Sequence, residues 1–125
     1  MEVTVRPEVK KSNLDTEFKT EERCYIVETA NDSGDELVSI SRARVEPGVT
    51  TAWHKLKGVA ERYIIISGQG RVEINDLDPM DVFEGDVVRI PSDTPQRITN
   101  TGQIDLIFYA VCSPRFQTSC YIRLE

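Results

Sequence analysis

Short segments rich in β-branched and aromatic residues recur along the chain, and clusters of Gly, Pro, Asp and Asn separate them. Short strands at such even spacing are typical of an all-β sandwich or barrel. A closed barrel is favoured over an open sandwich because closure removes exposed strand edges. We expect strands at or within residues 23–29, 37–45, 51–56, 62–66, 71–74, 80–91, 96–100, 105–112 and 120–124.

One segment has a composition that permits a helix. Residues 12–22 read SNLDTEFKTEE, and Ser12 or Asn13 could cap a helix at its start. The segment has no apolar stripe, so we expect at most one helical turn. The chain contains no repeat, low-complexity tract or linker, which predicts a single domain over residues 1–125.

The alternation within the strands predicts which side chains face the barrel interior, because residues two apart share a face. Three such sets are His54 with Leu56, Glu61 with Tyr63 and Ile65, and Gln96 with Ile98 and Asn100. If these sets face inward, the barrel holds a small polar cluster in an otherwise apolar lining. Ile64 and Ile66 then face outward, which predicts that a second sheet or a partner subunit covers them.

Composition narrows the choice of partner and compartment. The chain has 125 residues, of which 39% are hydrophobic and 29% charged, and its net charge is -6. This balance is that of a soluble globular domain, and it argues against binding to nucleic acid or to an anionic membrane. No apolar run could span a bilayer, and the charged N-terminus does not resemble a secretion signal. The three cysteines lack paired spacing, so we expect buried thiols, no disulfide framework and a reducing cytoplasm.

Two motifs of the chain resemble those of the cupin superfamily. The first family motif runs Gly, five residues, His-x-His, three or four residues, Glu, six residues, Gly. Residues 48–68 match it from Gly48 through His54 and Glu61 to Gly68, with Leu56 in place of the second histidine.

The second family motif runs Gly, five residues, Pro-x-Gly, two residues, His, three residues, Asn. Residues 85–100 match it from Gly85 through Pro91 to Asn100, with Asp93 in place of a glycine and Gln96 in place of the histidine. The resemblance implies a cupin-type β-barrel, also described as a double-stranded β-helix or jelly roll. Cupins include dioxygenases, isomerases, epimerases, lyases and binding proteins, so the motifs do not define the function.

The resemblance also implies where a metal would bind. In metal-binding cupins, three histidines and one glutamate at the motif positions hold Fe, Mn, Ni, Zn or a similar divalent ion. This chain keeps His54 and Glu61, offers Gln96, and has Leu56 at the remaining position. No second histidine exists, and one imidazole, one carboxylate and one amide oxygen form a weak set for a transition metal.

Two interpretations of these positions therefore stay open. Either His54, Glu61 and Gln96 retain a metal, or the site has lost it and lines a ligand pocket. We favour the second interpretation, with a pocket formed by the side chains of His54, Leu56, Glu61, Tyr63 and Gln96.

The leading functional hypothesis is a small-molecule-binding cupin with a degenerate metal site. The alternative is an enzyme acting on a sugar, a sugar phosphate or a small organic acid. Such an enzyme would use a metal on the reduced set, or would be a metal-free acid–base isomerase or epimerase. Glu61, His54 and Tyr63 are then the candidate catalytic residues, and apolar neighbours are expected to raise the Glu61 pKa. An inert buried pair of His54 and Glu61 is a further possibility.

The apolar strands also suggest a quaternary structure. The segment YIII at 63–66 and the residues VTV at 3–5 leave apolar sheet surface for one domain to cover. Many cupins pair two barrels, sometimes by exchanging an N-terminal strand. We therefore expect a homodimer.

Overall fold

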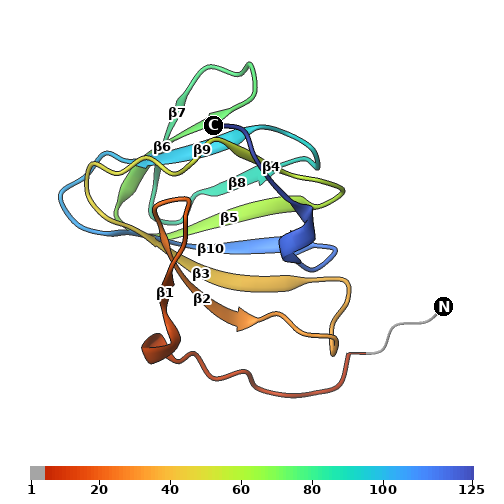
Figure 1. Ribbon diagram of the computed structural model, residues 1–125. Coiled ribbons are helices and arrows are strands. Elements are labelled where there is room, and N and C mark those ends of the chain that lie inside the picture. The colour runs from red at the N-terminus through yellow and green to blue at the C-terminus, as the bar shows by residue number, and fades with distance from the viewer. Residues whose placement is uncertain (1–4) are drawn as a thin grey trace.

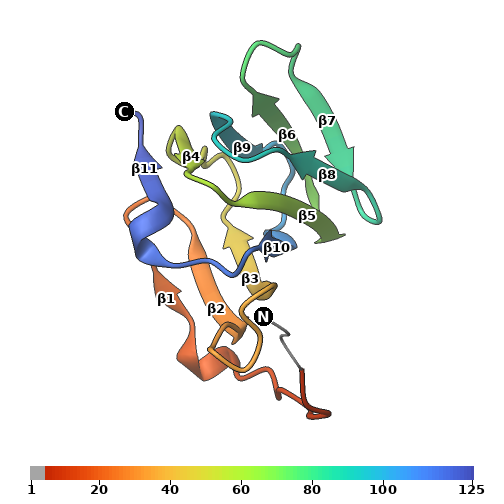
Figure 2. The same cartoon turned by 90° about the vertical axis from the view of Figure 1, so that its right-hand side faces the viewer.

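The computed structural model describes residues 5–125 as two antiparallel β-sheets that face each other (Figures 1 and 2). The six-stranded sheet has the order β1 (Phe18–Lys19), β2 (Tyr25–Ala30), β3 (Ser39–Val45), β10 (Leu106–Ser113), β5 (Ala60–Ser67) and β8 (Val87–Ile90). The five-stranded sheet has the order β11 (Tyr121–Arg123), β4 (His54–Leu56), β9 (Gln96–Asn100), β6 (Gln69–Ile74) and β7 (Met80–Phe83). Over residues 5–125, no helix is long and apolar enough to cross a membrane.

The strand pairing is nested, and this defines the topology. β3 pairs with β10, β4 with β9, β5 with β8, and β6 with β7, so the pairs run from the outermost strands to the innermost hairpin. Alternate pairs belong to alternate sheets, which is the arrangement of a jelly roll or double-stranded β-helix. The predicted all-β fold is confirmed.

The expected segments contain the observed strands, with small shifts at their ends, except for β1, which lies in the 12–22 segment and was not predicted. Residues 80–91 form two strands because Gly85, with a φ of 92°, makes a turn between β7 and β8. The predicted helical turn is a single 3₁₀ turn at Leu14–Thr16, and the Asn13 side chain accepts a hydrogen bond from the Asp15 amide at 3.0 Å. A second 3₁₀ turn, at Thr118–Cys120, was not predicted.

The inward and outward faces of the strands are those expected from the alternation. The inward sets are all buried, and Ile65 and Ile98 lie in the apolar core between the sheets. Ile64 and Ile66 point outward and are 37% and 40% exposed. Within residues 5–125 no second sheet covers Ile64 and Ile66, because the five-stranded sheet packs on the inner face of β5 and not on its outer face. Most of the 3–5 segment lies outside the described residues.

Asn100 connects three parts of the backbone beside the barrel. Its amide nitrogen donates to the carbonyl oxygens of Val45 and Ile104, each at 2.8 Å, and its Oδ1 accepts from the Gly102 amide at 2.8 Å. Asp93, which stands where the family motif has glycine, has a φ of 61°. Aspartate tolerates this left-handed conformation better than most residues do, so the turn is kept.

Candidate functional site

A cavity of about 510 Å³ opens into the barrel between the two sheets. Its walls come from β2, β3, β5 and β10 on one side and from β4, β9 and β11 on the other. Segments far apart in the chain therefore meet here, and β11 passes close to β4 (Figure 2). The volume is within the range of small-molecule pockets, and most of the lining is apolar or aromatic. The aromatic and larger aliphatic lining residues are Phe18, Ile26, Leu56, Tyr63, Ile98, Phe108, Phe116 and Tyr121.

Glu61 on β5 supplies a buried carboxylate to this cavity. Glu61 is only 8% exposed. Gln96 Nε2 donates to its Oε1 at 2.7 Å, and the Cys112 thiol donates to its Oε2 at 3.6 Å. Burial raises the pKa of Glu61, while the hydrogen bond from Gln96 and the nearby His54 act in the opposite direction. The expected rise of this pKa is confirmed.

Gln96 joins Glu61 to Tyr63. The Tyr63 hydroxyl donates to Gln96 Oε1, while Gln96 Nε2 donates to Glu61. Gln96 is 1% exposed and is not among the residues that line the cavity, although we expected it there. It lies on β9, behind the side chains that it connects. Because its amide both donates and accepts, it can satisfy a phenol and a carboxylate at once.

Tyr63 is held as a protonated phenol. Burial, together with the negative charges of Glu61 and Glu22, raises its pKa well above the ordinary value. Its ring packs on Phe108 with 4.4 Å between the ring centroids. The Tyr63 proton is committed to Gln96, so Tyr63 orients Gln96 rather than supplying a proton to the cavity.

His54 on β4 has one ring nitrogen engaged with the backbone. Its Nδ1 lies 2.8 Å from the Ala52 carbonyl oxygen, which can only accept, so Nδ1 carries the proton. In the neutral ring Nε2 is then the acceptor. The ring stacks on Tyr121 with centroids 5.0 Å apart. Among residues 5–125 no hydrogen bond joins His54 to Glu61, whereas the Glu22 carboxylate lies 3.6 Å from Nδ1.

Glu22, which sequence reasoning missed, lies in the connection between β1 and β2 and lines the cavity. Its Oε1 accepts from the Cys24 thiol at 3.2 Å. Its Oε2 is buried and has no hydrogen-bond partner in the part of the chain that the structure describes. A loop glutamate among other charged residues carries no signal in the sequence, and only the tertiary fold brings it beside His54.

The three cysteines are free and buried, as expected. Cys24 and Cys112 both line the cavity. Burial raises the pKa of each thiol, and the neighbouring carboxylates raise it further. Both thiols therefore remain protonated and act as weak donors to Glu22 and Glu61.

The residues present do not fit a transition metal. Gln96 Oε1, the donor atom that a metal would need, accepts from Tyr63, and its amide nitrogen faces Glu61. Leu56 offers no donor at the fourth position. Across residues 5–125 no group of three or more His, Cys, Asp or Glu side chains is arranged to hold a metal ion.

Fold and site together define a small jelly-roll barrel with a partly polar interior cavity. Residues 41–112 match the family described as "Cupin domain", which is more than half of the chain. The protein belongs to the cupin family.

Curated proteins with related sequences match about half of the chain. An oxalate-binding protein of Thermotoga maritima is 37% identical over 71 residues, which cover 57% of this chain and 58% of that protein. The chain thus spans just over half the length of the curated relatives that it matches.

Two solved structures share the fold. A double-stranded β-helix protein from Klebsiella pneumoniae superimposes with a TM-score of 0.76 at 15% identity, covering 94% of this chain and 99% of that one. KdgF from a Halomonas species gives 0.70 at 15% identity, covering 80% and 88%.

Proposed function

We propose that this cupin domain binds a small organic molecule in the barrel cavity without the help of a metal. The observation that carries the proposal is the state of the two positions that differ from the metal motif. Leu56 lines the cavity as an apolar residue, and Gln96 is withdrawn behind the wall, where both of its polar groups are engaged. The space that remains is a ligand-sized cavity whose exposed surface is mostly apolar.

The polar groups that can orient a ligand come from opposite walls. His54 can accept through Nε2, and Glu61 can accept or, when protonated, donate. The aromatic walls can hold an apolar body between them. This combination of an apolar lining and a few fixed polar groups supports recognition of an organic molecule rather than of a bare ion.

A metal-free acid–base enzyme is a second candidate, favoured by one observation. The raised pKa of Glu61 favours the protonated carboxyl group, while His54 Nε2 can accept a hydrogen bond in the same cavity. A carboxylic acid and an imidazole that act on one ligand could move a proton next to a carbonyl, as in an isomerase or epimerase. The substrate of such an enzyme would be a sugar, a sugar phosphate or a small organic acid.

Elemental analysis and a ligand screen test the proposal. We expect untagged protein to contain less than one transition metal ion per ten chains, and to be stabilised in a thermal-shift screen by at least one small organic compound. Ala110 lines the cavity, so Ala110→Phe should fill it and abolish the response. A stoichiometric metal, or a response that persists in a folded Ala110→Phe variant, would contradict the proposal.

We also propose that the protein is a cytoplasmic homodimer. The free buried cysteines support a reducing compartment. The exposed side chains of Ile64, Ile66 and the neighbouring Val87 support a partner on the outer face of β5 and β8.

A further inference from the structure

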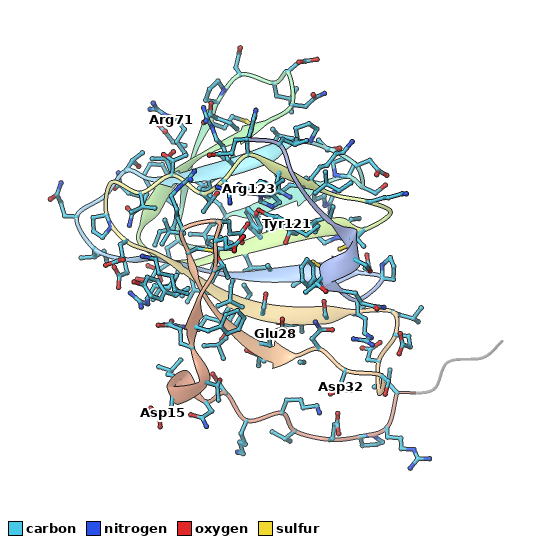
Figure 3. All side chains as sticks on the ribbon, viewed as in Figure 1. Asp15, Glu28, Asp32, Arg71, Tyr121 and Arg123 are labelled. Carbon is cyan, nitrogen blue, oxygen red and sulfur yellow. The ribbon has the colours of Figure 1, made fainter. Side chains whose placement is uncertain are left out.

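The charged residues that line the cavity are mostly acidic. Four carboxylates contribute to its wall, namely those of Glu21, Glu22, Glu28 and Glu61. Among the described lining residues the one Lys or Arg side chain is Arg123, which is exposed at the end of β11. Figure 3 shows Arg123 and Tyr121 on the C-terminal strand, and Glu28 on β2 on the opposite sheet.

The acids extend from the mouth of the cavity to its interior. Glu21 and Glu28 are exposed, Glu22 is half-buried and Glu61 is buried. An anion would therefore pass carboxylates along the whole path, whereas a cation would be attracted along it. Arg42 and Arg44 form ion pairs with Glu17, and neither arginine is among the lining residues.

The groups inside the cavity respond to this negative charge. The carboxylates of Glu61 and Glu22 contribute to raising the pKa of Tyr63 and of the Cys24 thiol, after burial itself. Glu22 likewise contributes, after burial, to the raised pKa of Glu61, because like charges disfavour each other. A positive group between them would relieve that repulsion.

Hydroxyl groups of Ser, Thr and Tyr side chains line the cavity and can either donate or accept, and two further groups act as acceptors. Glu22 Oε2 has no hydrogen-bond donor among residues 5–125, and His54 presents its Nε2 acceptor. Aromatic rings complete the wall, with Phe18 and Tyr121 near the opening and Phe108 further inside. Carboxylates together with aromatic faces are the features that bind organic ammonium groups, through charge and through the ring quadrupole.

We propose that the ligand is a small organic cation, an amine or quaternary ammonium group on an apolar body, and that carboxylates and phosphates are excluded. This inference rests on the proposed function, since it names the chemical class of the molecule that the cavity binds. It narrows the substrate classes considered above, because sugar phosphates and organic acids carry the wrong charge.

Three probes with the same ring test the charge preference. Benzylammonium, benzyl alcohol and benzoate differ mainly in the charge of one substituent, and each is small enough for the cavity. Titration calorimetry with EDTA present prevents a metal from bridging benzoate to the carboxylates. We expect benzylammonium to bind about tenfold more tightly than benzyl alcohol, and benzoate to bind more weakly than either.

Two variants assign the effect to the cavity. Glu22→Gln should reduce benzylammonium affinity about tenfold and leave benzyl alcohol affinity nearly unchanged. Glu84→Gln removes the same charge from the exposed turn between β7 and β8, so it should change neither.

The outcomes separate this inference from the proposed function. If benzoate or benzyl alcohol binds as tightly as benzylammonium and Ala110→Phe abolishes that binding, the cavity is a ligand site and the charge preference is wrong. A benzylammonium affinity that Glu22→Gln does not change also overturns the inference. If none of the three probes binds at millimolar concentration and the wider screen finds no ligand, both proposals fail.

Discussion

Replacing Glu61 by Gln removes the buried charge from the cavity while keeping the size and shape of the side chain. The amide oxygen of the variant can still accept the 2.7 Å hydrogen bond from Gln96 Nε2. The contact that is lost is the weak donation from the Cys112 thiol at 3.6 Å, which contributes about half a kcal/mol at most. The parent protein, in contrast, bears the cost of burying the Glu61 carboxylate without a full set of partners, about 1–3 kcal/mol, and the variant is relieved of it. We expect Glu61→Gln to be more stable than the parent at pH 7 by about 1–2 kcal/mol.

The pH dependence gives the sharper test because its sign follows from the direction of the pKa shift. The pKa of Glu61 is raised in the folded state, so the folded protein binds this proton more tightly than the unfolded chain does. This contribution to stability is fully present below the unfolded pKa and is lost as the pH rises through the folded pKa. The advantage of Glu61→Gln should therefore vanish below about pH 4, near the pKa of an unperturbed glutamate, and grow as the pH rises above it.

Chemical denaturation at several pH values measures this difference directly. In a chain of this size each kcal/mol corresponds to about 4 °C in melting temperature, so a thermal scan at pH 7 should show an increase of about 4–8 °C. Glu84→Gln, at an exposed position, serves as the matched control and should stay within about 0.5 kcal/mol at every pH. A Glu61→Gln variant that is less stable at pH 7, or whose advantage does not depend on pH, would refute the argument.

Further predictions concern metal binding, assembly and the frame of the barrel. The double variant Leu56→His with Gln96→His should bind Ni²⁺ or Zn²⁺ at least about tenfold more tightly than the parent in calorimetry; equal weak binding would contradict the inward placement of these positions. Light scattering should give a dimer mass at micromolar concentration, and Ile64→Lys should shift it to a monomer with an unchanged circular dichroism spectrum; a parent monomer would exclude the dimer. Asn100→Ala should lower the free energy of unfolding by about 2–4 kcal/mol, because it leaves the buried carbonyl oxygen of Val45 and the partly buried carbonyl oxygen of Ile104 without their donor; a loss below about 1 kcal/mol would show that water replaces it.

Local rules predicted the frame of the barrel well. Alternation alone placed Glu61 and Tyr63 on the inner face of one strand and Ile64 on the outer face, because a strand has a fixed period of two. Spacing within the second motif matched Gly85 to a family glycine, and the structure places it in a turn with a positive φ. These features depend on residues a few positions apart, so the sequence contains them.

The rest of the site depends on contacts between distant segments, which no local pattern encodes. Glu22 precedes His54 by more than thirty positions, and a tertiary contact, in which the Ala52 amide donates to the Glu22 carbonyl oxygen at 3.1 Å, holds the two segments together at the cavity. The alternation of side chains along the strand correctly predicted that Gln96 points inward. It could not show that Gln96 lies behind Tyr63 and outside the cavity lining. The alternation defines which face of the sheet a side chain occupies, but whether that side chain reaches the cavity depends on the residues packed in front of it.

The exchange of a histidine for Gln96 changes how the buried carboxylate is stabilised. A metal would hold Glu61 by charge, whereas here its oxygens receive two neutral donors, the Gln96 amide and the Cys112 thiol. Neutral donors stabilise a carboxylate less than a cation does, and burial raises the pKa of Glu61 in spite of them. The site therefore has an unmet demand for positive charge, which a proton or a cationic ligand can satisfy. A proton on Glu61 is the state that an acid–base enzyme would use, and a bound ammonium group is the state that a binding protein would use. The pH dependence of Glu61→Gln reports the first, and the comparison of benzylammonium with benzoate reports the second.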